Sequence, residues 1–417
     1  MHATRFVQQH ERWALAAAFV LVHAIVIMLG IKEGLAFYDL EVYQRWLGSA
    51  HDLGSLPAIG SDWVYPVVAL VPMLLASLGG GGVGFVAMWL VVVVALHAAV
   101  LVALWRFRVV GYSLAWGWLL ALALLGPIAL GRIDAVTAAL GLVGVAVIGR
   151  HPAIASALFT VGVWVKVWPA ALLAALVIAD RRRKAIAITA VIVSTVIVVL
   201  QTVLGGGRHV LGFAGVQVER GLQIEAPLAV FHMWQGAFGV GDATIHHDRA
   251  IGTWQVSGTG ADSLASASTP LMLVIVVAAV LLAAIAVRRL GSDARIAPVL
   301  ATVVVSGLLL TNKVGSPQFT IWLFVPAAWL CITWLGRHLA VPVVSILVCA
   351  FSTHVVVWGY RFILEVSPWM VGVLTVRDVS IACVCAWGFL QLGRLARRSA
   401  AAEKAGSSAD RRLTAHV

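Results

Sequence analysis

Long apolar runs, separated by short polar or charged stretches, recur along almost the entire chain. A helix needs roughly 20 apolar residues to cross a bilayer. The runs predict about ten full crossings, near residues 13–31, 83–104, 110–130, 134–149, 185–204, 269–287, 296–311, 318–335, 339–358 and 370–392. This pattern indicates an all-α polytopic membrane protein.

Two apolar segments do not fit a full crossing. Residues 64–78 are short and contain Pro66 and Pro72, so we expect them to enter from the outer side and return. Residues 153–180 begin and end beside basic clusters and contain Lys166-Val167-Trp168-Pro169 at their centre. Proline cannot donate a helix hydrogen bond and disfavours helical geometry before it. Two half-helices meeting at Lys166 therefore fit better than one long kinked helix.

Basic clusters set the expected orientation, because Lys and Arg favour the cytoplasmic side. The clusters are His10 to Arg12, Arg106 with Arg108, Arg150 with His151, Arg181 to Lys184, Arg288 with Arg289, Arg337 with His338, and the tail from Arg394. We expect a cytoplasmic N-terminus at 1–12, a membrane domain at 13–393, and a basic, disordered cytoplasmic tail at 394–417. Loops 32–63 and 205–268 then lie outside.

Composition supports this class. The chain is 61% hydrophobic and 11% charged, which no soluble domain requires. Its net charge of +11 lies in clusters beside the crossings, which is typical of topology signals and lipid headgroup contacts, not of nucleic-acid binding. The four cysteines fall within apolar runs and form no zinc pattern, so they are interpreted as small core residues.

Polar residues that are hard to explain structurally gather on the predicted outer side. A carboxylate there can act as a general base, while Lys and Arg bind phosphate. A transferase whose donor is a sugar on a lipid phosphate needs both. The main candidates are Asp39, Glu41, Asp62, Tyr65, Arg132, Asp134, Lys166, Arg220, Gln223, Glu225, Lys313, Gln318, Arg361 and Glu365.

Each candidate also has a structural explanation. Asp39 could cap an interfacial helix. Arg132 and Asp134 could form a local ion pair that closes a tight turn. Lys166 could extend to an interface, although its position before Trp-Pro at a helix break favours a functional role.

Two further polar clusters have structural interpretations. His246 and His247, with two nearby aspartates, suggest a metal site, but adjacent residues in one loop rarely converge on one ion, so a hydrated loop is favoured. Arg377 and Asp378 lie inside the last crossing, where we expect a neutralised pair that faces the bundle.

Six of these motifs, taken in order, resemble glycosyltransferase family 87, a family of GT-C-fold membrane enzymes. The resemblance runs from about residue 13 to residue 393. The motifs are Tyr38-Asp39-Leu40-Glu41-Val42-Tyr43, Tyr65-Pro66, Gly131-Arg132-Ile133-Asp134, Lys166-Val167-Trp168-Pro169, Arg220-Gly221-Leu222-Gln223-Ile224-Glu225 and Lys313-Val314-Gly315-Ser316-Pro317-Gln318-Phe319.

The resemblance implies a GT-C-like bundle with its active site at the extracytoplasmic face of the plasma membrane. It implies an inverting transfer of a sugar, mannose in the best-known members, from a polyprenyl-phosphate donor to a lipid-linked glycan of the phosphatidylinositol mannoside or lipomannan type. The acidic residue of the first outer loop, taken as the general base in such enzymes, maps onto Asp39.

We therefore assign roles to the matched positions. Lys166, Arg220 and Lys313 are expected to bind the donor phosphate, and no cofactor or metal is expected. The residues expected to contact substrate are Tyr43, Tyr65, Arg132, Asp134, Gln223, Glu225 and Gln318.

The chain departs from the family pattern at three uncharged positions. The usual Tyr-Pro-Pro ends in Val67, the Ser-Pro-Gln-Tyr form ends in Phe319, and Ala226 follows Glu225 where serine is common. No charged group is lost, so we expect the same reaction type, but the substrate is less narrowly defined. Glucose and arabinose remain alternatives to mannose.

A transporter or flippase is the alternative from another class. It would place ionisable groups near the bilayer midplane and use symmetric repeats. A scaffold without chemistry would leave the outer polar motifs unexplained. Charged groups gathered on one side favour the enzyme.

Overall fold

The long helices form the frame of the molecule. The computed structural model describes residues 2–107, 112–218, 220–249, 252–334 and 337–398. Within these residues, six helices are long and apolar enough to cross a membrane, counting α1 from His10. They are α1 (His2–Glu33), α4 (Val83–Arg106), α9 (Arg183–Val203), α12 (Ala261–Leu290), α15 (Ala340–Trp358) and α17 (Pro368–Arg397). The predicted all-α membrane architecture is confirmed.

Shorter apolar helices pack among them. These are α3 (Leu70–Ser77), α5 (Ser113–Leu125), α6 (Asp134–Val147), α7 (Pro152–Val165), α8 (Ala170–Ala179), α13 (Ile296–Thr311) and α14 (Phe324–Thr333). Four of the ten predicted crossings, 110–130, 134–149, 296–311 and 318–335, therefore contain short helices. Hydropathy did not distinguish them, because these runs are apolar throughout, and two of them, 110–130 and 318–335, combine a short helix with a 3₁₀ turn. The 14 residues of α6 span about 21 Å, less than the ~30 Å hydrocarbon core of a bilayer, so its polar ends cannot lie at both faces.

Short 3₁₀ turns join many of these elements. They are η1 (Leu35–Phe37), η2 (Leu53–Ser55), η3 (Val67–Ala69), η4 (Gly126–Ala129), η5 (Gly207–His209), η6 (Pro227–Ala229), η7 (Pro317–Leu323) and η8 (Arg337–Leu339). Most of the predicted tail, and one end of the predicted crossings 110–130 and 318–335, lie outside the described residues.

The segment 153–180 is a helical hairpin, as predicted. Helices α7 and α8 meet at residues 166–169, where the backbone of Lys166 is extended. The Arg182 guanidinium, just after α8, donates to the Gly149 carbonyl at 3.4 Å, just before α7. The segment therefore returns to the end at which it began, and the alternative of one kinked helix is wrong.

The segment 64–82 also returns to its starting side. It begins near Tyr65, whose ring lies 6.5 Å from that of Tyr43 in α2 (Tyr38–Gly48). It ends at Gly82, whose N–H donates to Gln44 of the same helix at 3.0 Å. Helix α4 then runs to the opposite end, where the Arg12 guanidinium lies over the Trp105 ring at 4.6 Å.

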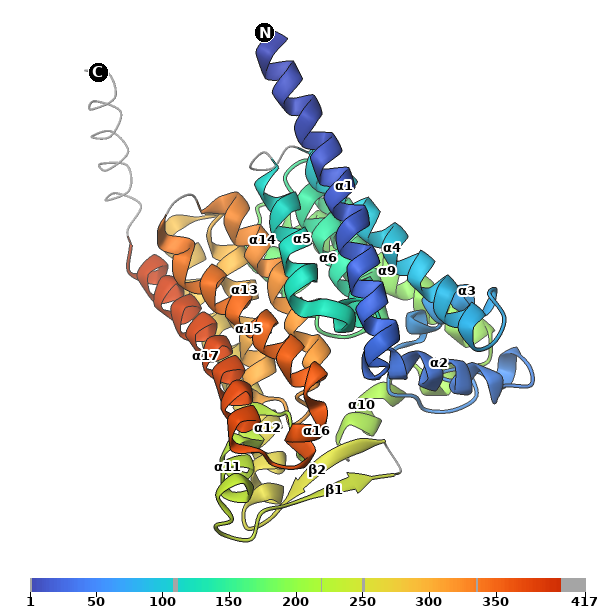
Figure 1. Cartoon of the computed structure of the whole chain (residues 1–417). Helices are drawn as coiled ribbons and strands as arrows, with labels where there is room; N and C mark the ends of the chain where they lie inside the picture. Colours follow the sequence, from blue (N-terminus) through green and yellow to red (C-terminus); the bar gives the residue numbers. More distant parts are fainter. Residues whose placement is uncertain (1, 108–111, 219, 250–251, 335–336, 399–417) are drawn as a thin grey trace.

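The loops gather at one end of the bundle. Figure 1 shows α2, α10 (Gly212–Val218), α11 (Val230–Phe238) and α16 (Tyr360–Leu364) at the end opposite to the chain's N-terminus and the last turns of α17. Charged loop residues from distant parts of the chain are thus brought to one end, which is the arrangement that the basic clusters predict.

A β-hairpin at this end was not predicted. Strands β1 (Thr244–Asp248) and β2 (Thr253–Ser257) pair antiparallel. The free edge of β2 is covered by the chain at Leu222 to Ile224: the Ile224 N–H donates to Trp254 O at 3.2 Å and the Val256 N–H to Leu222 O at 2.9 Å. Two five-residue strands that depend on this distant pairing leave little signal in the sequence. His246 and His247 lie on β1, and the described residues contain no group of three metal-ligating side chains.

Candidate functional site

Asp39 is tied to a distant turn of the chain. It lies in the first turn of α2, and its carboxylate forms an ion pair with Arg132, in the turn before α6. Arg132 also donates to Leu35 O at 3.3 Å. Gly131 permits this approach, because a Cβ there would lie 2.3 Å from Ala36 O. The helix-cap alternative is wrong, since Phe37 occupies the N-cap and no side chain caps the helix.

Asp134 and Lys166 form the second ion pair. The Lys166 ammonium lies 2.8 Å from both carboxylate oxygens of Asp134, and the Trp322 indole N–H donates to Asp134 at 2.6 Å. The same ammonium lies over the rings of Phe319 and Tyr65 at 4.4 and 5.7 Å. The two structural alternatives are therefore wrong: Arg132 and Asp134 do not form a local ion pair, and Lys166 does not extend to an interface. Because an ammonium has three donors, one N–H of Lys166 is left for a ligand.

An aromatic cluster from α2 and residues 63–65 contacts the second ion pair, because the Lys166 ammonium lies over the Tyr65 ring. Tyr65 packs edge-on against Trp63 and Trp46, with ring centroids at 5.3 and 6.1 Å. Tyr43 is 1% exposed, and its hydroxyl accepts the Ile133 N–H at 3.2 Å. Tyr43 thus supports the turn that carries the charged residues, while Trp46 and Tyr65 are only half-buried.

Tyr65 lies at the electrostatic centre of the site. Burial raises its pKa, and the nearby Asp39 and Asp134 carboxylates raise it further, whereas the Tyr43 hydrogen bond and Arg220 lower it. Charged residues from the first outer loop, from the turn before α6 and from the 205–268 loop therefore lie near this one side chain.

Arg220 and Lys313 bring two further cations. Burial lowers the pKa of Arg220, against the opposing effect of Tyr65. Burial and the charge of Arg220 lower the pKa of Lys313. The buried Nε of Arg220 has no hydrogen-bond partner among the described residues. A half-buried guanidinium with an unused donor is suited to an anionic ligand.

The two loops that carry these cations form one unit. The Gln223 N–H donates to Lys313 O at 3.0 Å, and the Gly315 N–H donates to the Gln223 side chain at 3.2 Å. A Cβ at Gly315 would lie 2.2 Å from the backbone of Glu225 and Ala226. Gln223 is thus occupied in joining the loops.

Arg377 holds this unit from within α17. The predicted pair with Asp378 is present, at 2.7 and 3.0 Å. The same guanidinium also donates to Gly315 O at 3.4 Å and to Glu225 O. These contacts with the two loop carbonyls were not predicted. An arginine within a membrane helix could have indicated them, because such a residue usually has several polar partners.

Glu225 faces Tyr360 of α16, whose hydroxyl donates to the carboxylate at 2.5 Å. Burial raises the pKa of Glu225, against the Tyr360 hydrogen bond and the charges of Arg377 and Arg132. Tyr360 was not predicted, because a tyrosine beside a membrane helix is typical of an interface position.

Two further predicted residues, Gln318 and Asp62, lie in other parts of the structure. Gln318 is half-buried in the first turn of η7, next to Phe319. Asp62 instead joins the first loop to the second, with its carboxylate 2.7 Å from the ring of His209. The site therefore consists of two ion pairs, two further cations, an aromatic wall and a buried carboxyl group.

Comparison with known proteins supports a family assignment. The model described as Glycosyltransferase family 87 matches residues 63–317, more than half of the chain. The matched range includes Tyr65, Arg132, Lys166, Arg220 and Lys313. Comparison with curated proteins finds no match.

Proposed function

The chain belongs to glycosyltransferase family 87, and from this premise we propose that it transfers mannose from a polyprenyl-phosphate donor to a lipid-linked glycan, with Asp39 as general base. The observation that carries the proposal is the Asp39–Arg132 ion pair at the end of the bundle where the cations converge. Asp39 keeps 26% of its side chain exposed, so a substrate hydroxyl can reach it.

The proposed reaction is a single displacement with inversion. Asp39 removes the proton of the acceptor hydroxyl as its oxygen forms a bond to the anomeric carbon of the sugar. The bond from that carbon to the phosphate oxygen breaks, and its electron pair stays with the phosphate. Arg132 orients the Asp39 carboxylate. Proton removal by a positioned base contributes typically 10²–10⁴-fold to rate.

The charge of the site suits a phosphate leaving group. The cations Arg132, Lys166, Arg220 and Lys313 outnumber the carboxyl groups Asp39, Asp134 and Glu225 by one. A lipid monophosphate gains negative charge as it departs, and preorganised cations stabilise that charge. In this proposal Lys166, Arg220 and Lys313 bind the phosphate, without a cofactor or metal.

The remaining residues take two kinds of role. We assign the sugar contacts to Tyr65, Glu225 and Gln318, with Trp46 as an additional surface for the sugar ring. Tyr43, Asp134 and Gln223 act as supports instead, because hydrogen bonds within the protein occupy their polar atoms.

The proposed site faces the outside of the plasma membrane. The basic clusters of the described residues lie toward the opposite end, with the first turns of α1 and the last turns of α17, and such clusters favour the cytoplasm. The polyprenyl chain of the donor and the lipid of the acceptor would then reach the site from the outer leaflet.

The test is reconstitution. Purified protein in vesicles is given radiolabelled polyprenyl-phosphate mannose and a lipid-glycan extract, with glucose and arabinose donors in parallel. A labelled glycolipid that appears only with protein supports the proposal, and the donor that reacts identifies the sugar. Donor movement across the bilayer without bond formation would instead establish the transporter alternative.

A further inference from the structure

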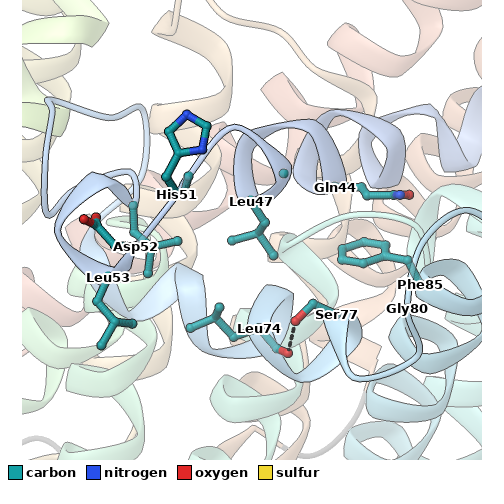
Figure 2. A pocket seen from close by; sticks show the side chains of 12 residues that line it. Gln44, Leu47, His51, Asp52, Leu53, Leu74, Ser77, Gly80 and Phe85 are labelled. Carbon is teal, nitrogen blue, oxygen red and sulfur yellow. Dashed lines mark hydrogen bonds between the residues drawn. The ribbon is translucent and has the colours of Figure 1, made fainter.

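A cavity of about 560 Å³ lies between α2 and α3, at the loop end of the bundle. Figure 2 shows Leu47 of α2 and Leu74 of α3 facing it, with Phe85 and Gln44 at one end and His51 at the other. Its volume is within the range of small-molecule binding sites, about 300–1,000 Å³. None of the residues described above as part of the reaction site lines it.

One wall of the cavity continues into a lipid-exposed surface. Leu74 lines the cavity and is also 38% exposed. Beside it on α3 and just after it, Val71, Leu75 and Leu78 are exposed apolar side chains. A contiguous exposed apolar surface on a membrane protein is expected to face hydrocarbon. A hydrocarbon chain can therefore pass from the bilayer to the cavity without crossing a polar surface.

The other end of the cavity is polar. His51 and Asp52 are exposed there, and the Asp52 carboxylate accepts the Ser55 N–H at 2.8 Å in an exposed turn. Among the described residues that line the cavity, none is Lys or Arg. Because the donor phosphate requires cations, this cavity does not suit the donor headgroup. Its lining suits an apolar chain whose hydroxyl-bearing headgroup emerges at the polar end.

The cavity and the proposed base share one helix. Gln44 and Leu47 lie three residues apart on one face of α2, and His51 follows the end of the helix at Gly48. The polar end lies beyond the last residue of α2, Gly48, which is nine residues after Asp39, a rise of about 14 Å. A glycan headgroup of more than one sugar that emerges there can therefore extend back along α2 to Asp39.

We propose that this cavity holds an acyl chain of the acceptor lipid and presents its headgroup hydroxyl to Asp39. The inference rests on the proposed function, because it names the acceptor's binding site for that reaction. Holding the chain raises the effective concentration of the hydroxyl at the base. Donor phosphate and acceptor tail then approach the reaction centre from different elements.

The first test is direct crosslinking. The protein is reconstituted with phosphatidylinositol that carries a diazirine on one acyl chain, irradiated, and mapped by mass spectrometry. We expect adducts between Gln44 and Leu56 and between Leu74 and Phe85. Gly48→Phe should reduce them roughly tenfold, because the ring occupies space that the chain would fill and removes part of its apolar contact.

Gly48 is a suitable position for this substitution. It lines the cavity, and a Cβ there would meet no atom within 4 Å. Gly117 on α5 is equally open and is exposed away from the cavity, so Gly117→Phe is the matched control. Adducts confined to outer helix faces, or equal labelling of the two variants, would overturn the proposal.

The second test compares an acylated acceptor with its deacylated, water-soluble form. Gly48→Phe should reduce the preference for the acylated acceptor, measured as the ratio of the two KM values, roughly tenfold, and Gly117→Phe should not. An unchanged ratio in Gly48→Phe would count against the cavity. If the wild-type protein transfers no sugar at all, the proposed function fails, and the crosslinking result alone decides whether a lipid chain occupies the cavity.

Discussion

At the scale of residues, the site depends on charges that are paired across long distances in the chain. Asp39 pairs with Arg132, and Asp134 pairs with Lys166. Asp134 is almost fully buried, so Lys166 serves both as its counter-charge and as a candidate phosphate ligand. Removing one partner of a buried pair leaves an uncompensated charge, whereas replacing both can be nearly neutral.

This pairing predicts a separation of stability from activity. Lys166→Met should destabilise the protein by roughly 3–5 kcal/mol, because the Asp134 carboxylate loses its counter-charge in a buried position. The double variant Lys166→Met with Asp134→Asn should recover most of that stability but little turnover. Thermal unfolding in detergent and donor turnover are measured on all three proteins. Full recovery of turnover in the double variant would show that Lys166 has no role beyond neutralising Asp134.

Glu225 predicts a pH dependence of stability. Its pKa is raised above the ordinary value of 4.5, chiefly by burial. The folded state therefore binds a proton that the unfolded state has lost, and stability falls as pH rises from about 4.5 through the raised pKa. Glu225→Gln removes this titration, so its melting temperature should depend less on pH over that interval. If the melting temperatures of the variant and the wild type change with pH in the same way from pH 4 to 8, the raised pKa of Glu225 is contradicted.

The residue types and motif order were predictable from the sequence, but apart from the adjacent Arg377–Asp378 pair the partners were not. Asp39 and Arg132 are 93 positions apart (132 − 39), and their contact requires the Gly131 turn to reach η1. No local pattern encodes that approach. Tyr360 was missed for the same reason, since its partner Glu225 lies in another loop.

At the scale of elements, the charged residues of the candidate site lie in turns at helix ends. Lys166 lies between α7 and α8, Arg132 precedes α6, and Lys313 follows α13. The hairpin at Lys166 was predictable because proline has a local effect on the backbone. The β-hairpin was not, because its edge is completed by a segment about 30 residues earlier in the chain.

The packed loops predict a sensitive glycine. Gly315→Ala forces apart the segments at 225–226 and 313–316, because the new Cβ would lie 2.2 Å from backbone atoms that Arg377 also holds. We expect turnover to fall at least tenfold, on the scale of 1–3 kcal/mol for an overpacked contact. Gly393→Ala, in α17 with open space around it, is the control and should retain turnover. Equal activity of the two variants would contradict the view that the packing of these two loops determines the geometry of the site.

At the scale of the whole molecule, α2, α10, α11 and α16 lie at the end of the bundle opposite to the first turns of α1 and the last turns of α17 (Figure 1). A site at this one end suits an enzyme better than a transporter with alternating access. Hydropathy and basic clusters were enough to predict this polarity, because both depend on local composition.

Thiol labelling tests the orientation. In a form without the four native cysteines, Ser49→Cys at the loop end and Lys184→Cys at the opposite end are both exposed positions. A membrane-impermeant thiol reagent on intact cells should label position 49 and leave position 184 unlabelled until the cells are opened. Labelling of position 184 in intact cells would reverse the proposed topology.

The central claim is that this protein transfers a sugar from a polyprenyl phosphate and that Asp39 accepts the proton. The most direct measurement is turnover of radiolabelled polyprenyl-phosphate mannose into glycolipid by reconstituted wild-type, Asp39→Asn and Glu41→Gln proteins. Asp39→Asn keeps the side-chain shape without the basicity, so turnover should fall on the order of 10²-fold or more. Glu41→Gln, an exposed neighbour in the same helical turn, should remain close to wild type. Near-normal turnover by Asp39→Asn in a folded protein would contradict the account.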